Sequence, residues 1–113
     1  MITLNLKREN YWLDILPDLR LFVRPASTAV IMAARTAALK DNPLDLIQRG
    51  TTLLKCLAEV AILEWEGVGD DDGNILQPTP DNVHALLDLW PVADAFERLY
   101  LAPALLLEQE KNV

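Results

Sequence analysis

Residues 11–25 read YWLDILPDLRLFVRP, and this stretch decides how the chain begins to fold. Its second half alternates, with Leu19, Leu21 and Val23 on one side and Arg20, Phe22 and Arg24 on the other. A period of two is the pattern of a half-buried strand. Pro17-Asp18 separates the two halves, and these residue types favour a tight turn. The stretch therefore predicts a short antiparallel hairpin that ends at Pro25, with a further strand expected before it at Ile2 to Leu6.

Two helices are predicted in the middle of the chain. Ser27 or Thr28 can cap a helix over residues 29–40, which holds five alanines. Asn42 and Pro43 then suit the cap and the first position of a second helix. Apolar residues recur at three- and four-residue spacing from Leu46 to Ala61, so this second helix is expected to run to about Glu66.

A loop and two further helices are predicted in the remaining sequence. Residues 67–74 read GVGDDDGN, a composition typical of a loop. Thr79 and Pro80 suit the cap and first position of a short helix that carries Leu86 and Leu87. Pro91 then starts the last helix. Pro103 is expected to bend this helix, because proline lacks a backbone donor and crowds the preceding turn.

These elements predict a mainly α protein with a small N-terminal β-hairpin, an α+β fold in which about four helices pack around one core. With 113 residues the chain has the usual length of one domain, so residues 1–113 are expected to form a single unit. Residues 1–25 would be the hairpin segment and residues 26–113 the helical part. At 51% hydrophobic and 24% charged, the composition is that of an ordinary globular protein.

The charge and the apolar runs limit the classes of partner. A formal net charge of −7 has the wrong sign for binding a phosphate backbone, so no nucleic acid is expected as a partner. No apolar run approaches the ~20 residues that span a bilayer, and the N-terminus does not have the pattern of a signal peptide. Cys56 is the only cysteine. We therefore expect a cytoplasmic protein with no membrane partner.

The sequence offers few residues for catalysis or cofactor binding. His84 is the only histidine and is best explained as a helix residue, while Cys56 is best explained as a small core side chain. Asp70, Asp72 and Asn74 have the first spacings of a calcium loop, but Ile75 stands where that loop needs glycine. A tight acidic turn is the better interpretation of this segment. We expect no enzyme activity, no metal and no cofactor.

The aromatic and apolar residues indicate protein binding instead. Trp65 and Trp90 are each expected at the end of a helix, where core packing is favoured over an interface role. Trp12 and Phe22 fit both roles equally, because a two-stranded ribbon has one face with little to cover it. The first and last helices are apolar on more than one face. Since a short chain cannot easily bury all of this surface itself, a partner or self-association is inferred.

Several short motifs resemble the small tail assembly chaperones of long-tailed bacteriophages. They are WEGVGDDDGN at residues 65–74, PTPDNV at 78–83, Leu86-Leu87, a last helix with Phe96 and Tyr100, and Glu110-Lys111-Asn112. The hairpin that leads through Val23-Arg24-Pro25 into a capped helix is also similar. The resemblance covers most of the chain. It implies a non-enzymatic protein that binds the long tape measure protein, and possibly the tail tube protein, and keeps the former soluble before the tail forms.

The resemblance also implies that this chain is the shorter of two related gene products, the one made without a programmed frameshift. We predict Ile31, Met32, Tyr100, Leu105 and Leu106 as protein-binding residues, because they lie on the two helices with the broadest apolar surface. Two other classes remain open at this point. One is a structural virion component such as a tail or head-completion subunit, and the other is a small regulatory module that binds a different protein.

Overall fold

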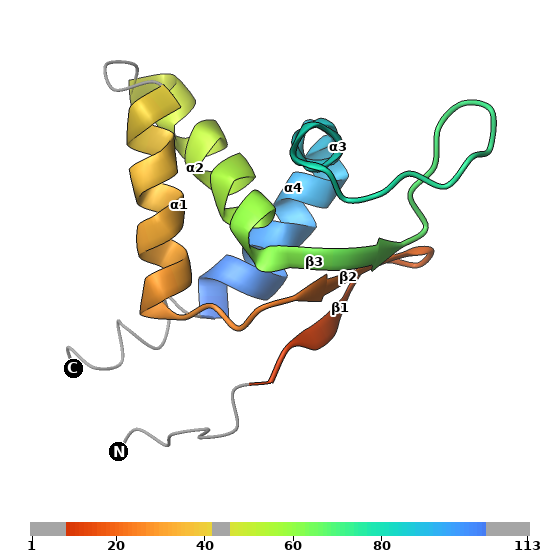
Figure 1. Ribbon diagram of the computed structural model, residues 1–113. Coiled ribbons are helices and arrows are strands. Elements are labelled where there is room, and N and C mark those ends of the chain that lie inside the picture. The colour runs from red at the N-terminus through yellow and green to blue at the C-terminus, as the bar shows by residue number, and fades with distance from the viewer. Residues whose placement is uncertain (1–8, 42–45, 104–113) are drawn as a thin grey trace.

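The structure is a computed structural model that describes residues 9–41 and 46–103. Three strands and four α-helices follow one another in the order β1 (Tyr11–Leu16), β2 (Leu19–Val23), α1 (Thr28–Asp41), α2 (Leu46–Ala61), β3 (Ile62–Glu66), α3 (Pro80–Leu87) and α4 (Trp90–Phe96). A π-helical turn, η1 (Glu97–Leu101), continues α4 (Figure 1). The predicted α+β fold, with four helices and an N-terminal hairpin, is confirmed.

The hairpin lies where the alternation of the sequence predicted it. β1 and β2 pair antiparallel around the turn at Pro17-Asp18, with Trp12 opposite Phe22 and Asp14 opposite Arg20. Leu19, Leu21 and Val23 are buried on one face of the sheet, whereas Arg20 is exposed on the other. The strand expected at residues 2–6 lies outside the described residues. The period of two therefore correctly separated the core face from the outer face of β2.

The expected extent of the second helix was wrong. The helix α2 ends at Ala61, and the next five residues form β3, which pairs antiparallel with β2 in the sheet order β1-β2-β3. The amide of Arg24 donates to the carbonyl oxygen of Ala61 at 2.9 Å, so the end of α2 is joined directly to the end of β2. Because this pairing joins segments about forty residues apart, a helical period read along the chain could not reveal it.

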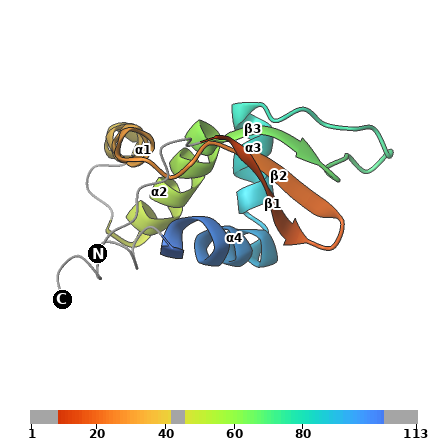
Figure 2. The same ribbon diagram turned by 90° about the horizontal axis from the view of Figure 1, so that it is seen from below.

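The first helix has the predicted cap. The hydroxyl oxygen of Ser27 accepts from the amide of Val30 at 3.3 Å, and the carbonyl of Ser27 accepts from the amide of Ile31. Val30, Ala34 and Ala38 recur every four residues and are buried. Since α1 packs chiefly against α2, its opposite side receives no other helix or strand of the described chain (Figures 1 and 2). The cap expected at Asn42 and Pro43 lies outside the described residues.

The last two helices begin as predicted. The hydroxyl of Thr79 accepts from the amide of Asn82, and Pro80 occupies the first turn of α3. Proline at the second position starts α4 after Leu89, which has an extended backbone. The last helix changes to the wider π-helical turn η1 just before Pro103, where the amide of Ala102 donates to the carbonyl of Glu97. A local widening of the helix thus lies directly before Pro103.

The core lies between the sheet and the helices on one of its faces, α2, α3 and α4 (Figure 2). Phe96 and Tyr100 stack here with their ring centroids 4.9 Å apart. The hydroxyl of Tyr100 donates to the backbone oxygen of Arg24 at 2.7 Å, and burial raises the pKa of this phenol well above its ordinary value of 10.0. The last helix is therefore tied to the segment that joins β2 to α1.

The hydrogen bond from Tyr100 can be removed with little change in shape. Tyr100→Phe is expected to lower the free energy of unfolding by about 1 kcal/mol, because the carbonyl of Arg24 loses a donor while the ring still packs. Urea unfolding followed by circular dichroism measures this difference. A loss above about 3 kcal/mol would mean that the hydroxyl is a larger part of the core than one hydrogen bond allows.

None of the helices in the described residues is long and apolar enough to cross a membrane.

Candidate functional site

A groove opens at the end of the sheet where the β1–β2 turn lies. Its volume is about 440 Å³. Three separate segments line it, the hairpin turn, the start of the loop after β3, and the α3–α4 junction: Leu16, Pro17, Asp18, Leu19, Gly67, Val68, Gly69, Leu86, Leu89 and Val92. We call this the turn groove. Its lining is mainly apolar, and Asp18 is its only charged lining residue.

A close backbone approach sets one wall of the turn groove. Gly67 has a φ of 92°, and a Cβ added to it would overlap the carbonyl oxygen of Asp18. Only glycine permits both this dihedral and this contact. The indole nitrogen of Trp65 donates to the carbonyl of Leu76 at 2.7 Å, which ties the two arms of the loop together. The amide of Leu76 donates in turn to the carbonyl of Val68. The wall is thus held by backbone geometry and by one buried indole.

Exposed apolar side chains extend the surface of the turn groove. Leu16 is 38% exposed and Leu89 is 56% exposed, although both are groove residues. Trp90, which follows Leu89, is 71% exposed. The expectation that Trp90 is a core residue was therefore wrong, because Trp90 is the first residue of α4 and its side chain faces solvent, whereas Trp65 is in the core as predicted. A large exposed indole next to an apolar groove is typical of a protein-binding surface.

The outer side of α1 is a second exposed apolar surface. Met32 is 52% exposed and Leu39 is 56% exposed, with the exposed residues Ala29, Ala33 and Thr36 on the same side of the helix. We call this the α1 outer face. Its charged neighbours are Arg35 and Lys40, so this face is basic although the whole chain is acidic. The two apolar surfaces therefore differ in the sign of the charge beside them.

The three predicted contact residues that the structure describes do not share one exposed surface. Met32 is exposed on the α1 outer face, and Ile31 is half-buried against the core. Tyr100 is only 2% exposed and is therefore a core residue, since the apolar face of the last helix that carries it turns inward. Leu105 and Leu106 lie outside the described residues. Sequence reasoning missed the turn groove, although Pro17-Asp18 and the glycines of residues 67–69 marked two of its three segments.

The acidic segment after the groove is a tight turn. One carboxylate oxygen of Asp70 accepts from the amides of Asp72 and Asn74 at 3.0 and 2.9 Å, and the other accepts from the side chain of Asn74. These bonds, led by that from the Asn74 amide, lower the pKa of Asp70 below its ordinary value of 3.8. Gly73 has a φ of 84° and completes the turn. The described residues contain no group of three or more side chains placed to hold a metal ion.

The hydrogen bonds of Asp70 predict a pH dependence of this turn. A carboxyl group whose pKa is lowered by folding stabilises the fold above its unfolded pKa, and this contribution is lost as the pH falls through the folded pKa. We therefore expect the side chain of Asp70 to titrate below pH 3.8 in a carboxyl-detected NMR titration. The amide shifts of Asp72 and Asn74 should follow the same midpoint. A midpoint above 3.8 would contradict the hydrogen bonding described here.

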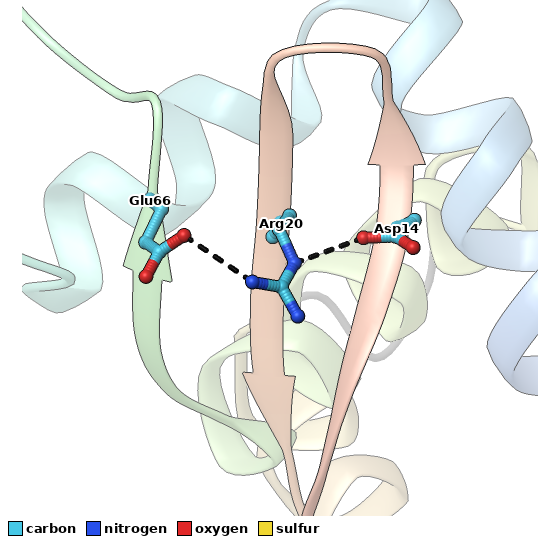
Figure 3. Close-up of polar contacts among 3 residues, drawn as sticks. All are labelled: Asp14, Arg20 and Glu66. Atoms are coloured by element: carbon cyan, nitrogen blue, oxygen red, sulfur yellow. Dashed lines mark hydrogen bonds and ion pairs between the residues drawn. The ribbon is translucent and has the colours of Figure 1, made fainter.

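The outer face of the sheet is covered by a charged network. Arg20 donates from Nε to Asp14 on β1 at 2.9 Å and reaches Glu66 on β3 at 3.5 Å (Figure 3). Its guanidinium also lies 4.8 Å from the centre of the Trp12 ring, and Trp12 packs against Phe22 with a centroid distance of 5.1 Å. Trp12 and Phe22 are both half-buried. The network joins all three strands and satisfies the charge of Arg20 within the chain.

The two residues considered for catalysis are a core side chain and a member of a surface ion pair. Cys56 is buried in the core on α2, as predicted. Nε2 of His84 lies 2.9 Å from a carboxylate oxygen of Glu59, so this pair links α3 to α2 at the surface. Lys55 and Asp88 form a second ion pair between the same parts of the fold.

No family model, curated protein sequence or solved structure matches this chain.

Proposed function

We propose that this chain is a non-enzymatic tail assembly chaperone of a tailed bacteriophage or prophage. It binds the tape measure protein in the host cytoplasm and keeps it soluble until the tail tube forms around it. The motifs of residues 65–74 and 78–83, with the hairpin and the last helix, support this assignment through their resemblance to that class of protein. The tail tube protein and a second copy of the chain are further partners that the assignment allows.

One structural observation carries the proposal. The described residues expose apolar side chains on two separate surfaces, the turn groove and the α1 outer face, while the chain as a whole carries a charge of −7. An exposed apolar surface can cover the apolar face of an amphipathic helix of another protein and so shield that face from water. An acidic remainder keeps such a complex in solution. A chaperone for a long helical protein requires both properties together.

Co-expression with the product of the long open reading frame downstream tests the proposal. We expect the two proteins to co-purify, and we expect the long protein to be insoluble when it is made alone. A long protein that is equally soluble alone and fails to co-purify would contradict the proposal. Mass spectrometry of purified particles separates the chaperone from the virion component, because a chaperone is missing from the finished particle and a tail subunit is present in it.

A further inference from the structure

The turn groove has the surface chemistry of a site for a helix. Small-molecule sites are concave and mostly apolar, with a few convergent polar groups. The turn groove has one charged lining residue, its lining residue Leu89 is 56% exposed, and the next residue, Trp90, is 71% exposed. An occupant must therefore cover both the groove and the exposed side chain of Leu89. One face of an amphipathic α-helix, with apolar residues three and four apart, has this shape.

An acidic side chain without an ion pair lines the turn groove and defines the charge of its occupant. Asp18 lines the groove, and Gly69 leads directly into Asp70, Asp71 and Asp72. Asp18, Asp71 and Asp72 form no ion pair within the described residues. An occupant that carries lysine or arginine would supply the missing positive charge.

Three of the basic side chains that the structure describes have carboxylate partners. Arg20 is held between Asp14 and Glu66 on the outer face of the sheet (Figure 3). Lys55 pairs with Asp88, and Arg98 pairs with Asp94. Arg35 and Lys40 belong to α1, a helix that supplies no residue to the groove. None of the basic side chains that the structure describes, Arg24 included, lines the turn groove.

We propose that the turn groove binds an amphipathic α-helix of the partner protein in which an apolar stripe is flanked by lysine or arginine. The proposal rests on the proposed function and specifies which segments of the tape measure protein the chaperone recognises. Leu89 and Trp90 supply the exposed apolar contact, and Asp18 faces the basic flank. The basic α1 outer face carries charge of the wrong sign for such a segment, so the two apolar surfaces of the chain are not equivalent.

Leu89→Ser removes the apolar contact without loss of fold. Leu89 is the N-cap of α4 and has no side-chain cap bond, so serine there can supply the missing hydrogen bond. Leu39→Ser is the matched control, because Leu39 has the same 56% exposure and lies on α1. Thermal unfolding by circular dichroism verifies that both variants stay folded. Both variants make the same chemical change, so a difference in binding between them reports where the leucine lies.

The probes are two synthetic helical peptides with the same leucine stripe, one flanked by lysine and one by glutamate. Binding is measured by fluorescence anisotropy with the full chain. We expect the lysine peptide to bind the wild-type chain and to displace the long partner from it in a pull-down. The affinity for this peptide should fall as salt is added. Leu89→Ser should weaken its binding about tenfold, as loss of a central apolar contact does, and Leu39→Ser less than about twofold.

Three results would overturn the groove assignment while leaving the proposed function intact. In the first, Leu89→Ser retains the long partner and binds the lysine peptide as tightly as the wild-type chain does. In the second, the wild-type chain binds the glutamate peptide more tightly than the lysine peptide. In the third, Leu39→Ser loses peptide binding while Leu89→Ser keeps it. A wild-type dimer that Leu89→Ser converts to a monomer in light scattering would assign the groove to a second copy, which also overturns the proposal. Failure of the wild-type chain to retain the long partner would instead remove the proposed function itself.

Discussion

Gly67→Ala is expected to lower the free energy of unfolding by about 3 kcal/mol. A non-glycine residue at a φ of 92° costs on the order of 1–3 kcal/mol in backbone strain. The added Cβ would in addition overlap the carbonyl oxygen of Asp18, which is backbone and cannot rotate away. The hairpin turn or the end of β3 must therefore shift, and the turn groove opens. Urea unfolding of the purified variant measures the loss.

Gly73→Ala is the matched control for this prediction. Gly73 also has a positive φ, of 84°, but a Cβ added there would meet no atom within 4 Å. The substitution should therefore cost only the backbone preference, about 1 kcal/mol. Equal losses in the two variants would mean that the contact between Gly67 and Asp18 does not hold the wall of the groove.

Phe96→Ala is expected to lower the free energy of unfolding by about 3–5 kcal/mol, a large part of the stability of a domain of this size. The ring of Phe96 is fully buried and stacks on Tyr100, so its removal leaves a cavity between the last helix and the sheet. This expected loss is the range measured when buried aromatic side chains are truncated to alanine. Thermal unfolding followed by near-ultraviolet circular dichroism reports the loss of this packing.

Trp90→Ala gives the contrasting result within the same helix. The indole of Trp90 is mostly exposed, so its loss should change the free energy of unfolding by less than about 0.5 kcal/mol. A large loss of stability in Trp90→Ala together with a small loss in Phe96→Ala would reverse the assignment of core and surface on α4.

Local signals in the sequence predicted most of the elements. The hairpin followed from strict alternation around Pro17-Asp18, and α3 followed from Thr79 and Pro80 at its start. In each case the residues that decide the structure are neighbours in the sequence, so propensity and capping chemistry are sufficient. The buried position of Cys56 followed in the same way from its place in an apolar segment.

The third strand was missed because its partner is distant. Leu63, Glu64, Trp65 and Glu66 alternate apolar and acidic residues, which is a strand pattern, but the helical period before it was extended through this segment. The pairing of Arg20 with Glu66 and of Leu21 with Trp65 decides the matter in the folded chain. A four-residue alternation after a long helix thus merited a strand assignment.

The turn groove was not predictable from local patterns. It is built from the hairpin turn, the glycines after β3 and the α3–α4 junction, and no property of one segment shows that the other two lie beside it. The burial of Tyr100 has the same origin, because the helix face that the sequence marked as apolar packs into the core. Apolar patterns identify faces that must be covered, whereas the tertiary structure decides which of them the chain covers itself.

The soluble fraction of the long protein encoded downstream tests the proposed function most directly. The long protein downstream would be expressed alone, with the wild-type chain, and with the Leu89→Ser variant, and its distribution between supernatant and pellet would be measured. We expect it in the pellet when made alone, in the supernatant with the wild-type chain, and partly in the pellet with Leu89→Ser. An unchanged distribution when the wild-type chain is present would contradict the claim that this protein is a tail assembly chaperone.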